Sequence, residues 1–299
     1  MNKNLKYNYQ PLRRNFLGIE EKFSCFNNSK IVILPIPYEA TTSYGKGASK
    51  GPEAIIKASH YVEFFDEETE RELCFEKGIC TLKAINFKEY TGKKAMNLIY
   101  NYVRNLIAEN KFVVSLGGEH SISNPLVRAH FDKNDNFSIL QLDAHSDLRN
   151  SYEGTKYSHA CVAARIAEFT DNIVQMGIRA QSKEEFEFIK NKKIRIFYSY
   201  GMKHKLYGTD WKKQVIDSLK ENVYITFDID FLDPSIMPST GTPEPDGFNW
   251  IETLDFMKKL SESRKIIGMD FVELSPNKRN YFPDFLTAKL IYKMLNIFL

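Results

Sequence analysis

Short apolar runs alternate with longer amphipathic segments along most of the chain. Eight runs rich in Val, Ile, Leu and Phe predict strands, at residues 31–35, 79–85, 112–116, 138–142, 173–178, 194–198, 223–227 and 266–272. Between them, segments with apolar residues at helical spacing predict helices, among them residues 92–110, 182–191, 211–221 and 249–263. Because nearly continuous apolar strands must be buried on both faces, this alternation predicts a mainly parallel sheet covered by helices on both sides.

The chain carries no sign of a division into domains. Its 299 residues show no shift in composition, no linker rich in Ser, Gly or Pro, and no repeat. With 43% hydrophobic and 26% charged residues, the composition is typical of a globular protein that can bury a sizeable core. We therefore predict one α/β domain over residues 1–299, a three-layer α/β/α sandwich around a central, mainly parallel eight-stranded sheet.

Charge and cysteine content argue against several classes of protein. The 41 basic and 38 acidic residues leave a formal charge of +3, which argues against a nucleic acid partner. Four cysteines without paired spacing predict reduced thiols, at Cys25, Cys74, Cys80 and Cys161. Residues 1–7 lack the apolar core of a signal peptide, and no run approaches the ~20 apolar residues of a membrane-spanning helix. We expect a cytoplasmic protein that is not inserted in a membrane.

Potential metal ligands follow three of the predicted strands. After residues 138–142 come Asp143, His145 and Asp147, whose spacing of two places all three side chains on one face of an extended chain. The other two strands run into further ligands, His120 after residues 112–116, and Asp228 and Asp230 after residues 223–227. Because the sites of open parallel sheets lie beyond the carboxyl ends of the strands, we expect these six side chains to meet.

The kinds of ligand indicate which metal would bind. Four carboxylates and two imidazoles form an oxygen-rich set that suits Mn²⁺, with Fe²⁺, Co²⁺ and Zn²⁺ fitting less well. Six ligands exceed what one metal with a reactive water requires, so two metals ~3.5–4 Å apart that share carboxylates fit better. Singly, each motif would more often be a capped turn, but their occurrence at three strand ends favours a metal site.

The motifs resemble those of a known family. Residues 117–121, 143–147 and 226–234 are similar to the three metal motifs of the ureohydrolases, which include arginases and agmatinases. The resemblance extends through three further segments, residues 45–59, 240–245 and 268–276. It therefore covers nearly the whole chain, and it implies an α/β/α sandwich with an eight-stranded parallel sheet and assembly into homo-oligomers, either trimers or hexamers.

The resemblance also implies how the ligands divide between two manganese ions. One ion would be held by His120, Asp143, Asp147 and Asp228, and the other by Asp143, His145, Asp228 and Asp230. Asp143 and Asp228 would then bridge the two ions.

The same comparison implies roles for residues around the metals. His159 matches the family's proton-relaying histidine, Glu273 the carboxylate that orients the guanidinium group, and Asp147 would help to orient the attacking water. Both substrate roles suit the chemistry, since imidazole titrates near neutrality and a carboxylate matches the planar donors of a guanidinium. Three departures from many relatives are Glu119 in place of aspartate, Ala160-Cys161 after the histidine, and residues 277–280. The last two lie near the expected pocket and leave the exact substrate open.

The reaction implied is hydrolysis of a guanidinium compound to urea and an amine. Agmatine, which gives putrescine, is the leading substrate. The alternatives are N1-aminopropylagmatine or another guanidino compound, as in an arginase, guanidinobutyrase or formimidoylglutamase. A different class of alternative is a ureohydrolase fold kept only for binding, which would be expected to lack a ligand.

Substrate preference depends on residues expected around the outer pocket. Glu153 and Glu244, with the nearby rings of Tyr152 and Tyr157, would suit an ammonium tail through charge and cation–π contacts. Arg149 and Lys156 in the same region could instead meet a carboxylate. We therefore predict contacts from Glu153 and Glu244 to the substrate.

Overall fold

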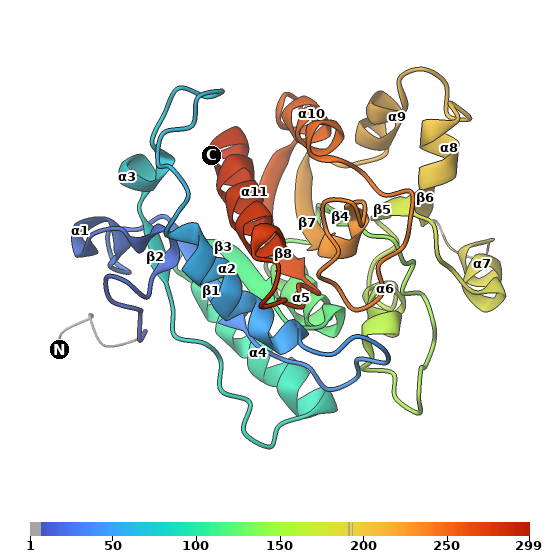
Figure 1. Cartoon of the computed structure of the whole chain (residues 1–299). Coiled ribbons are helices and arrows are strands. Elements are labelled where there is room, and N and C mark those ends of the chain that lie inside the picture. Colours follow the sequence, from blue (N-terminus) through green and yellow to red (C-terminus); the bar gives the residue numbers. More distant parts are fainter. Residues whose placement is uncertain (1–6, 191, 193) are drawn as a thin grey trace.

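The computed structural model describes residues 7–190, 192 and 194–299, and within these residues eight strands form one sheet. Along the chain the strands are β1 (Ile31–Ile36), β2 (Ile79–Thr81), β3 (Phe112–Gly117), β4 (Ser138–Leu142), β5 (Ile173–Ile178), β6 (Arg195–Tyr198), β7 (Asn222–Asp228) and β8 (Lys265–Val272). Every pairing is parallel, and the spatial order is β2-β1-β3-β8-β7-β4-β5-β6. The predicted α/β fold with an eight-stranded parallel sheet is confirmed (Figure 1).

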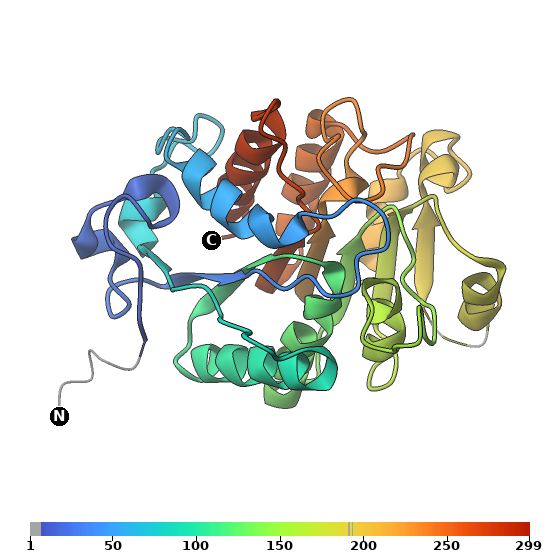
Figure 2. The ribbon, with the colours of Figure 1, turned by 60° about the horizontal axis from the view of Figure 1, so that its bottom comes forward.

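Helices cover both faces of the sheet. They are α1 (Glu21–Ser24), α2 (Gly51–Ser59), α3 (Leu73–Lys77), α4 (Gly92–Ala108), α5 (Ser123–Lys133), α6 (Val162–Ile166), α7 (Lys183–Lys190), α8 (Ser199–Lys203), α9 (Trp211–Asp217), α10 (Trp250–Ser261) and α11 (Phe282–Phe298). Short 3₁₀ turns include η4 (His120–Ile122), η5 (His159–Cys161) and η6 (Ile229–Phe231), with η2 (Phe16–Gly18) and η3 (Ala48–Lys50) nearer the N-terminus. Figure 2 shows α2, α10 and α11 on one side of the sheet and α4, α5 and α6 on the other.

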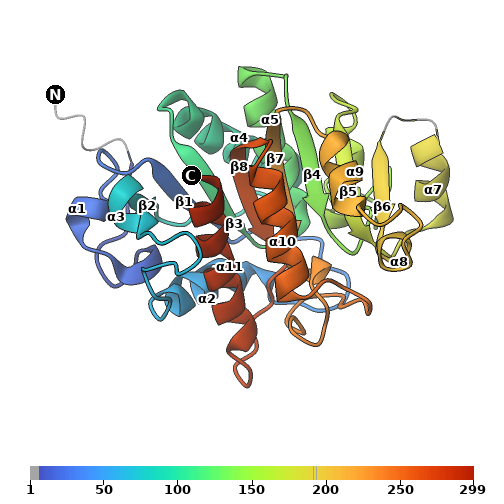
Figure 3. The same cartoon turned by 90° about the horizontal axis from the view of Figure 1, so that it is seen from above.

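Alternate residues of a single strand enter two separate cores. In β1, Ile31 and Ile33 belong to the core that also contains side chains of α2, α10 and α11, whereas Val32, Leu34 and Ile36 belong to the core with side chains of α4, α5 and α6. This is the behaviour of a strand with period-two side chains that is buried on both faces. The view in Figure 3 shows the sheet between these two layers of helices.

The predicted boundaries differ from the structure in a few places. The predicted strand at residues 79–85 pairs only over Ile79–Thr81, because β2 lies at the edge of the sheet and only three of its residues have partners in β1. The predicted helices at 92–110 and 211–221 end earlier, at Ala108 and Asp217. The predicted helix 182–191 corresponds to α7, and Asn191 lies outside the described residues, as do residues 1–6 of the predicted N-terminal segment.

The strand order brings four segments to one edge of the sheet. β3, β8, β7 and β4 are adjacent at its centre, so residues beyond their carboxyl ends can converge although they lie far apart in the sequence. Within the described part of the chain, no helix is both long and apolar enough to cross a membrane.

Candidate metal centre

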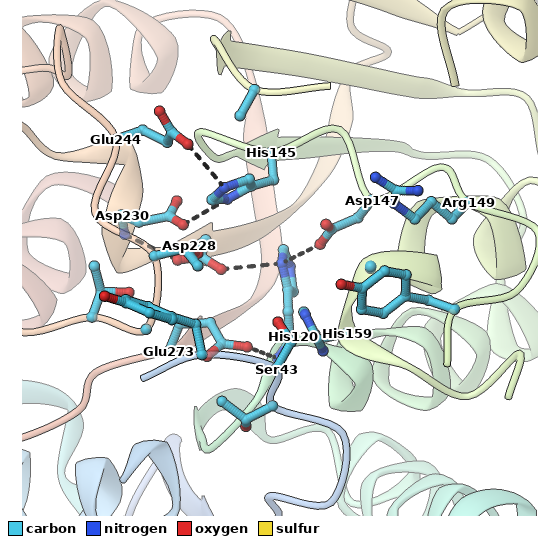
Figure 4. Close-up of a pocket in the computed structure, with 18 of the residues that line it drawn as sticks. Ser43, His120, His145, Asp147, Arg149, His159, Asp228, Asp230, Glu244 and Glu273 are labelled. Carbon is cyan, nitrogen blue, oxygen red and sulfur yellow. Dashed lines mark hydrogen bonds and ion pairs between the residues drawn. The ribbon is translucent and has the colours of Figure 1, made fainter. Parts of the chain in front are cut away.

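A cavity of about 310 Å³ opens beyond the carboxyl ends of the four central strands. His120 reaches it from η4 after β3, Asp228 ends β7, and Asp230 lies in η6. His145 and Asp147 come from the segment after β4. Figure 4 shows their side chains pointing toward one another across the cavity. Asp143, the sixth predicted ligand, directly follows β4 and has no exposed surface.

The six side chains form two overlapping groups. His120 Nδ1 lies 3.0 Å from Asp143 Oδ2, 3.1 Å from Asp147 Oδ2 and 3.3 Å from Asp228 Oδ2. His145 Nδ1 lies 2.8 Å from Asp230 Oδ2 and 3.7 Å from Asp143 Oδ1.

Asp143 thus directs one oxygen toward each histidine, as a carboxylate shared by two ions would. The structure brings the six predicted ligands together, while their role as ligands and their division between two metals stay predictions.

The donor atoms fit a bound cation. His120 is 1% exposed, and among the described residues its Nδ1 has no hydrogen-bond partner although three carboxylate oxygens lie within 3.3 Å. Within the described residues, the ion pairs of the four carboxylates are made with the two histidines alone, so four buried anions face two imidazoles. Burying unpaired charge is costly, and a divalent cation at the point of convergence would satisfy both the nitrogen and the carboxylates.

The electrostatics of the group point the same way. Burial, together with the charges of Asp230 and Asp143, raises the pKa of Asp228 well above its ordinary value. Burial and the charge of Asp143 raise the pKa of Asp147 to about 6. Burial disfavours the charged form of His145, but Asp230 and Asp143 outweigh it and raise its pKa to about 11. This repulsion among carboxylates is the condition that bound cations relieve.

Buried polar side chains inside the strands hold two of the ligands. His120 Nε2 lies 2.9 Å from Thr226 Oγ1, whose hydroxyl is 2.8 Å from Asp270 Oδ1. Gln141 Nε2 donates to Asp143 Oδ2 over 2.8 Å. Such contacts fix the orientation of metal ligands. The sequence reasoning assigned no role to Thr226, Asp270 and Gln141; the available signal was a polar residue within each apolar strand.

Two residues with predicted functional roles adopt unusual backbone conformations. Asp147 has φ 51° and Glu273 has φ 65°, both in the left-handed region that non-glycine residues seldom occupy. Neighbouring backbone holds them there, since the Asp147 carbonyl accepts from the N–H groups of Ala163 and Ala164, and the Glu273 N–H donates to the Gly118 carbonyl. Strain of this kind is found at functional sites. Burial also raises the pKa of Glu273 to about 8.

His159 and Glu244 line the cavity, as predicted, and Glu153 does not. Burial lowers the pKa of His159, whose ring makes an edge contact of 5.8 Å with Tyr152. Glu244 is half-exposed, with Oε1 3.9 Å from His145 Nε2. Glu153 is exposed in the turn between Tyr152 and Thr155, so its contact with substrate stays a prediction.

Several residues of the cavity were missed by the sequence reasoning. Thr42, Ser43 and Tyr44 line it from the segment after β1, and Arg179, which is not among the lining residues, contacts the backbone of Glu244. The Arg179 guanidinium donates to the backbone carbonyls of Glu244 and Asp230, and so joins the metal segment to the loop that carries Glu244. The residues after β1 include no metal ligand, which left little signal in the sequence.

Comparison with known proteins agrees with the site. The model of the arginase family matches residues 29–296, nearly the whole chain. The chain belongs to the arginase family. Among curated relatives of this arginase-family protein is the N(1)-aminopropylagmatine ureohydrolase of Synechocystis sp., 36% identical over 92% of this chain and 91% of the relative. The agmatinase of Bacillus cereus is 34% identical to this chain over 84% of this chain's length and 85% of its own length.

A solved structure gives the same result. The agmatine ureohydrolase of Thermoplasma volcanium is 30% identical, covers 90% of both chains and superposes with a TM-score of 0.78. With the residues of the binuclear metal site present, this arginase-family protein is a metal-dependent ureohydrolase, similar to agmatinases, that acts on a guanidino compound.

Proposed function

We propose that the enzyme hydrolyses a guanidinobutyl amine, with agmatine as substrate and putrescine and urea as products. The observation that carries the proposal is the pair of carboxylates at two positions of one cavity, the buried Glu273 beside His120 and Glu244 beside His145, with the Glu244 side chain 37% exposed. Agmatine carries a guanidinium group at one end and an ammonium group at the other. Each carboxylate can therefore meet one cationic end of the same molecule.

We propose that two Mn²⁺ ions occupy the six-ligand site. When bound, they supply Lewis acidity and lower the pKa of water, so that hydroxide is available near neutral pH. The protein's own residues do the rest. Glu273 binds the planar guanidinium and holds its central carbon in place, and Asp147 orients the attacking oxygen. His159, which burial keeps neutral at rest, relays a proton to the amine nitrogen that leaves.

Contacts in the outer pocket support an ammonium tail held by Glu244. The Arg149 guanidinium already lies over the Tyr152 ring at 5.1 Å, and the His159 ring makes an edge contact with it at 5.8 Å, so less of this ring is available to a substrate cation. Arg149 would repel an ammonium group, whereas Glu244 lies on the loop tied down by Arg179. We therefore assign the tail to Glu244 and not to the pair of tyrosines expected from the sequence.

N1-aminopropylagmatine is the second candidate substrate. It shares the guanidinobutyl end with agmatine and carries a longer cationic tail. A specific observation favours it, because the relative from Synechocystis sp. that bears this name is 36% identical to the chain over most of its length. Glu244, with its partly exposed side chain, could meet a nitrogen of either tail.

A urea-release screen with Mn²⁺ tests the proposal. Agmatine, N1-aminopropylagmatine, arginine and guanidinobutyrate are compared, and formiminoglutamate is followed by formamide release. We expect kcat/KM for agmatine or N1-aminopropylagmatine to exceed that for arginine by at least ~100-fold, about 2.7 kcal/mol. Similar rates with arginine would overturn the role of Glu244 in tail recognition. If no compound releases urea or formamide, the enzyme proposal fails and a binding role takes its place.

The family resemblance also supports a homo-oligomer, a trimer or hexamer. Light scattering of the purified protein measures this directly, and a monomeric mass would overturn it.

A further inference from the structure

The Thr41 hydroxyl lies between a buried carboxylate and the ring of His159. Thr41 Oγ1 donates to Glu119 Oε1 over 2.9 Å, and it lies 3.2 Å from His159 Nδ1. It also accepts a hydrogen bond of 3.1 Å from the His159 backbone N–H. Thr41 comes from the segment after β1, Glu119 from the end of β3 and His159 from η5, so three distant parts of the chain meet at one hydroxyl.

The hydrogen bonds at the Thr41 hydroxyl determine which ring nitrogen of His159 carries a hydrogen. A threonine hydroxyl has one proton to donate and two lone pairs that accept. Because Thr41 gives its proton to Glu119, it can only accept from His159, so Nδ1 must carry a hydrogen. A neutral imidazole then keeps its free lone pair on Nε2. The Ser158 hydroxyl, 3.4 Å from Nδ1, is a weaker second neighbour of the same nitrogen.

Glu119 is itself held rigidly. Its Oε2 accepts from the backbone N–H groups of Ala40 and Thr41, at 2.7 and 2.6 Å, and its Oε1 also accepts from the Ser121 hydroxyl at 2.6 Å. With four donors and no exposed surface, the carboxylate acts as an acceptor toward Thr41.

The backbone on both sides is also closely packed. The Glu119 N–H donates to the Tyr38 carbonyl over 2.9 Å, which docks the segment carrying Thr41 against the end of β3. Gly118 allows this approach, because a Cβ at that position would lie only 2.0 Å from the Tyr38 carbonyl oxygen. The backbone segments that follow β1 and β3 therefore fix the position of the Thr41 hydroxyl.

We propose that Thr41, anchored by Glu119, is a positioning residue that fixes the orientation and tautomer of His159. The inference rests on the proposed function in one respect, the use of His159 as the proton relay. Through this chain of contacts, Nε2 is kept ready to accept a proton during each turnover.

A double-mutant cycle tests the proposal with agmatine. Thr41→Val keeps the size of the side chain and removes the hydroxyl, and Thr41→Ser restores it. We expect Thr41→Val to lower kcat by ~10-fold or more with KM and bound metal nearly unchanged, and Thr41→Ser to recover most of the loss. In the His159→Ala background, Thr41→Val should change kcat by less than ~2-fold, because the group it acts through is gone.

The cycle separates positioning from a general structural effect. A loss of the same size in the His159→Ala background would mean that Thr41 acts on the fold, and it would overturn the proposal. So would a Thr41→Val enzyme with the kcat of the original protein. Thr253→Val is the matched control, since Thr253 is a buried threonine of α10 that donates to the Asn249 carbonyl and lies outside the cavity. The Thr253→Val enzyme should have the same kcat as the original protein.

A second measurement does not depend on activity. In Zn²⁺-loaded protein with ¹⁵N-labelled histidine, long-range ¹H–¹⁵N spectra at pH 8 distinguish the two tautomers, and His159→Ala assigns the signal. We expect a protonated Nδ1 at His159, and loss of this preference in Thr41→Val. A proton on Nε2 in the original protein would overturn the proposal. If no guanidino compound is hydrolysed, the proposed function fails and this spectrum still decides the inference.

Discussion

Glu273 Oε1 accepts a hydrogen bond of 2.6 Å from the backbone N–H of His120. The residue after β8 is thereby tied to the metal-ligand segment after β3, its neighbour in the sheet. The bond uses one carboxylate oxygen, and Oε2 makes no hydrogen bond within the described residues. The contact that positions Glu273 therefore leaves an oxygen for the substrate (Figure 4).

Replacing Glu273 with Gln tests its role toward the guanidinium group. The Gln carbonyl can still accept from the His120 N–H, so the site should keep its shape and its metal. A bound guanidinium favours the charged form of Glu273 against the burial that raises its pKa to about 8, and this charged pair is lost in the variant. We therefore expect kcat/KM for agmatine to fall at least ~100-fold, since charge-assisted pairs are the strong ones. Steady-state kinetics with metal analysis measure both. An unchanged kcat/KM would remove Glu273 from substrate binding.

Replacing Asp228 with Ala tests the shared ligand. Asp228 approaches His120 and, through its Oδ1, accepts from the Asp230 N–H over 2.9 Å. If it bridges two ions, both lose a ligand and the repulsion between them is less compensated, so bound manganese should fall well below two per chain. Elemental analysis after dialysis measures this. Two tightly bound metals in the variant would refute the bridging role.

Glu244 and Glu153 were both predicted to contact the substrate, and only Glu244 lies in the cavity. We expect Glu244→Gln to lower kcat/KM for agmatine by ~10-fold and to change that for arginine less, because one charge contact to the tail is lost. Glu153→Gln, at an exposed turn, should leave both values unchanged. The reverse result would place the tail near Glu153.

Lys293 is 4% exposed and contacts three acidic residues, with Nζ 2.9 Å from Asp66 Oδ2, 3.3 Å from Glu67 Oε1 and 3.0 Å from Glu68 Oε1. Lys293→Met keeps most of the aliphatic stem and leaves the buried Asp66 without its cation. We expect a loss of about 3 kcal/mol in the free energy of unfolding at pH 7. Urea unfolding of the metal-free proteins measures it. Lys57→Met is the matched control, because its pair with Glu53 is exposed and should contribute little.

The loss from Lys293→Met should depend on pH. Burial works to raise the pKa of Asp66, but Lys293 and the Thr69 N–H outweigh it and lower the pKa below its ordinary value. A carboxyl with a lowered pKa in the fold stabilises the protein above its unfolded pKa of ~3.9 and loses this contribution as the pH falls through the folded value. Because the unfolded chains titrate alike at this carboxyl, the gap in the free energy of unfolding should narrow as Asp66 becomes protonated, first in the variant, where burial without Lys293 disfavours its charged form, and then in the original protein. A constant gap down to pH 3 would contradict the pairing.

The sequence predicted the strands well, because burial on both faces alone determines their hydrophobic pattern. The strands of this sheet are apolar on both faces, so each appears as a continuous run, and the ligands at their ends follow in fixed spacing. The edge strand was predicted too long, because Leu82 and Ile85 are buried and donate to β1 carbonyls without forming further residue pairs of the ladder.

Contacts between distant segments could not be read in this way. Thr41, Thr226 and Asp270 form hydrogen bonds with residues from other strands or segments, and their local sequence does not indicate which residues these are. Glu153 and Glu244 carry the same charge, and only the course of their loops separates the one inside the cavity from the one outside it. The hydrophobic pattern likewise does not predict the order of the strands in the sheet.

The position of β8 has a consequence for how the protein is made. β8 is synthesised after the other seven strands of this sheet, yet it lies between β3 and β7 and joins the two parts of the sheet. His120 belongs to one part and the other five predicted ligands to the other. A nascent chain that has not yet released residues 265–272 from the ribosome therefore holds the ligands on unconnected pieces. We expect tight metal capture to begin only after β8 has left the ribosome and joined the two parts of the sheet.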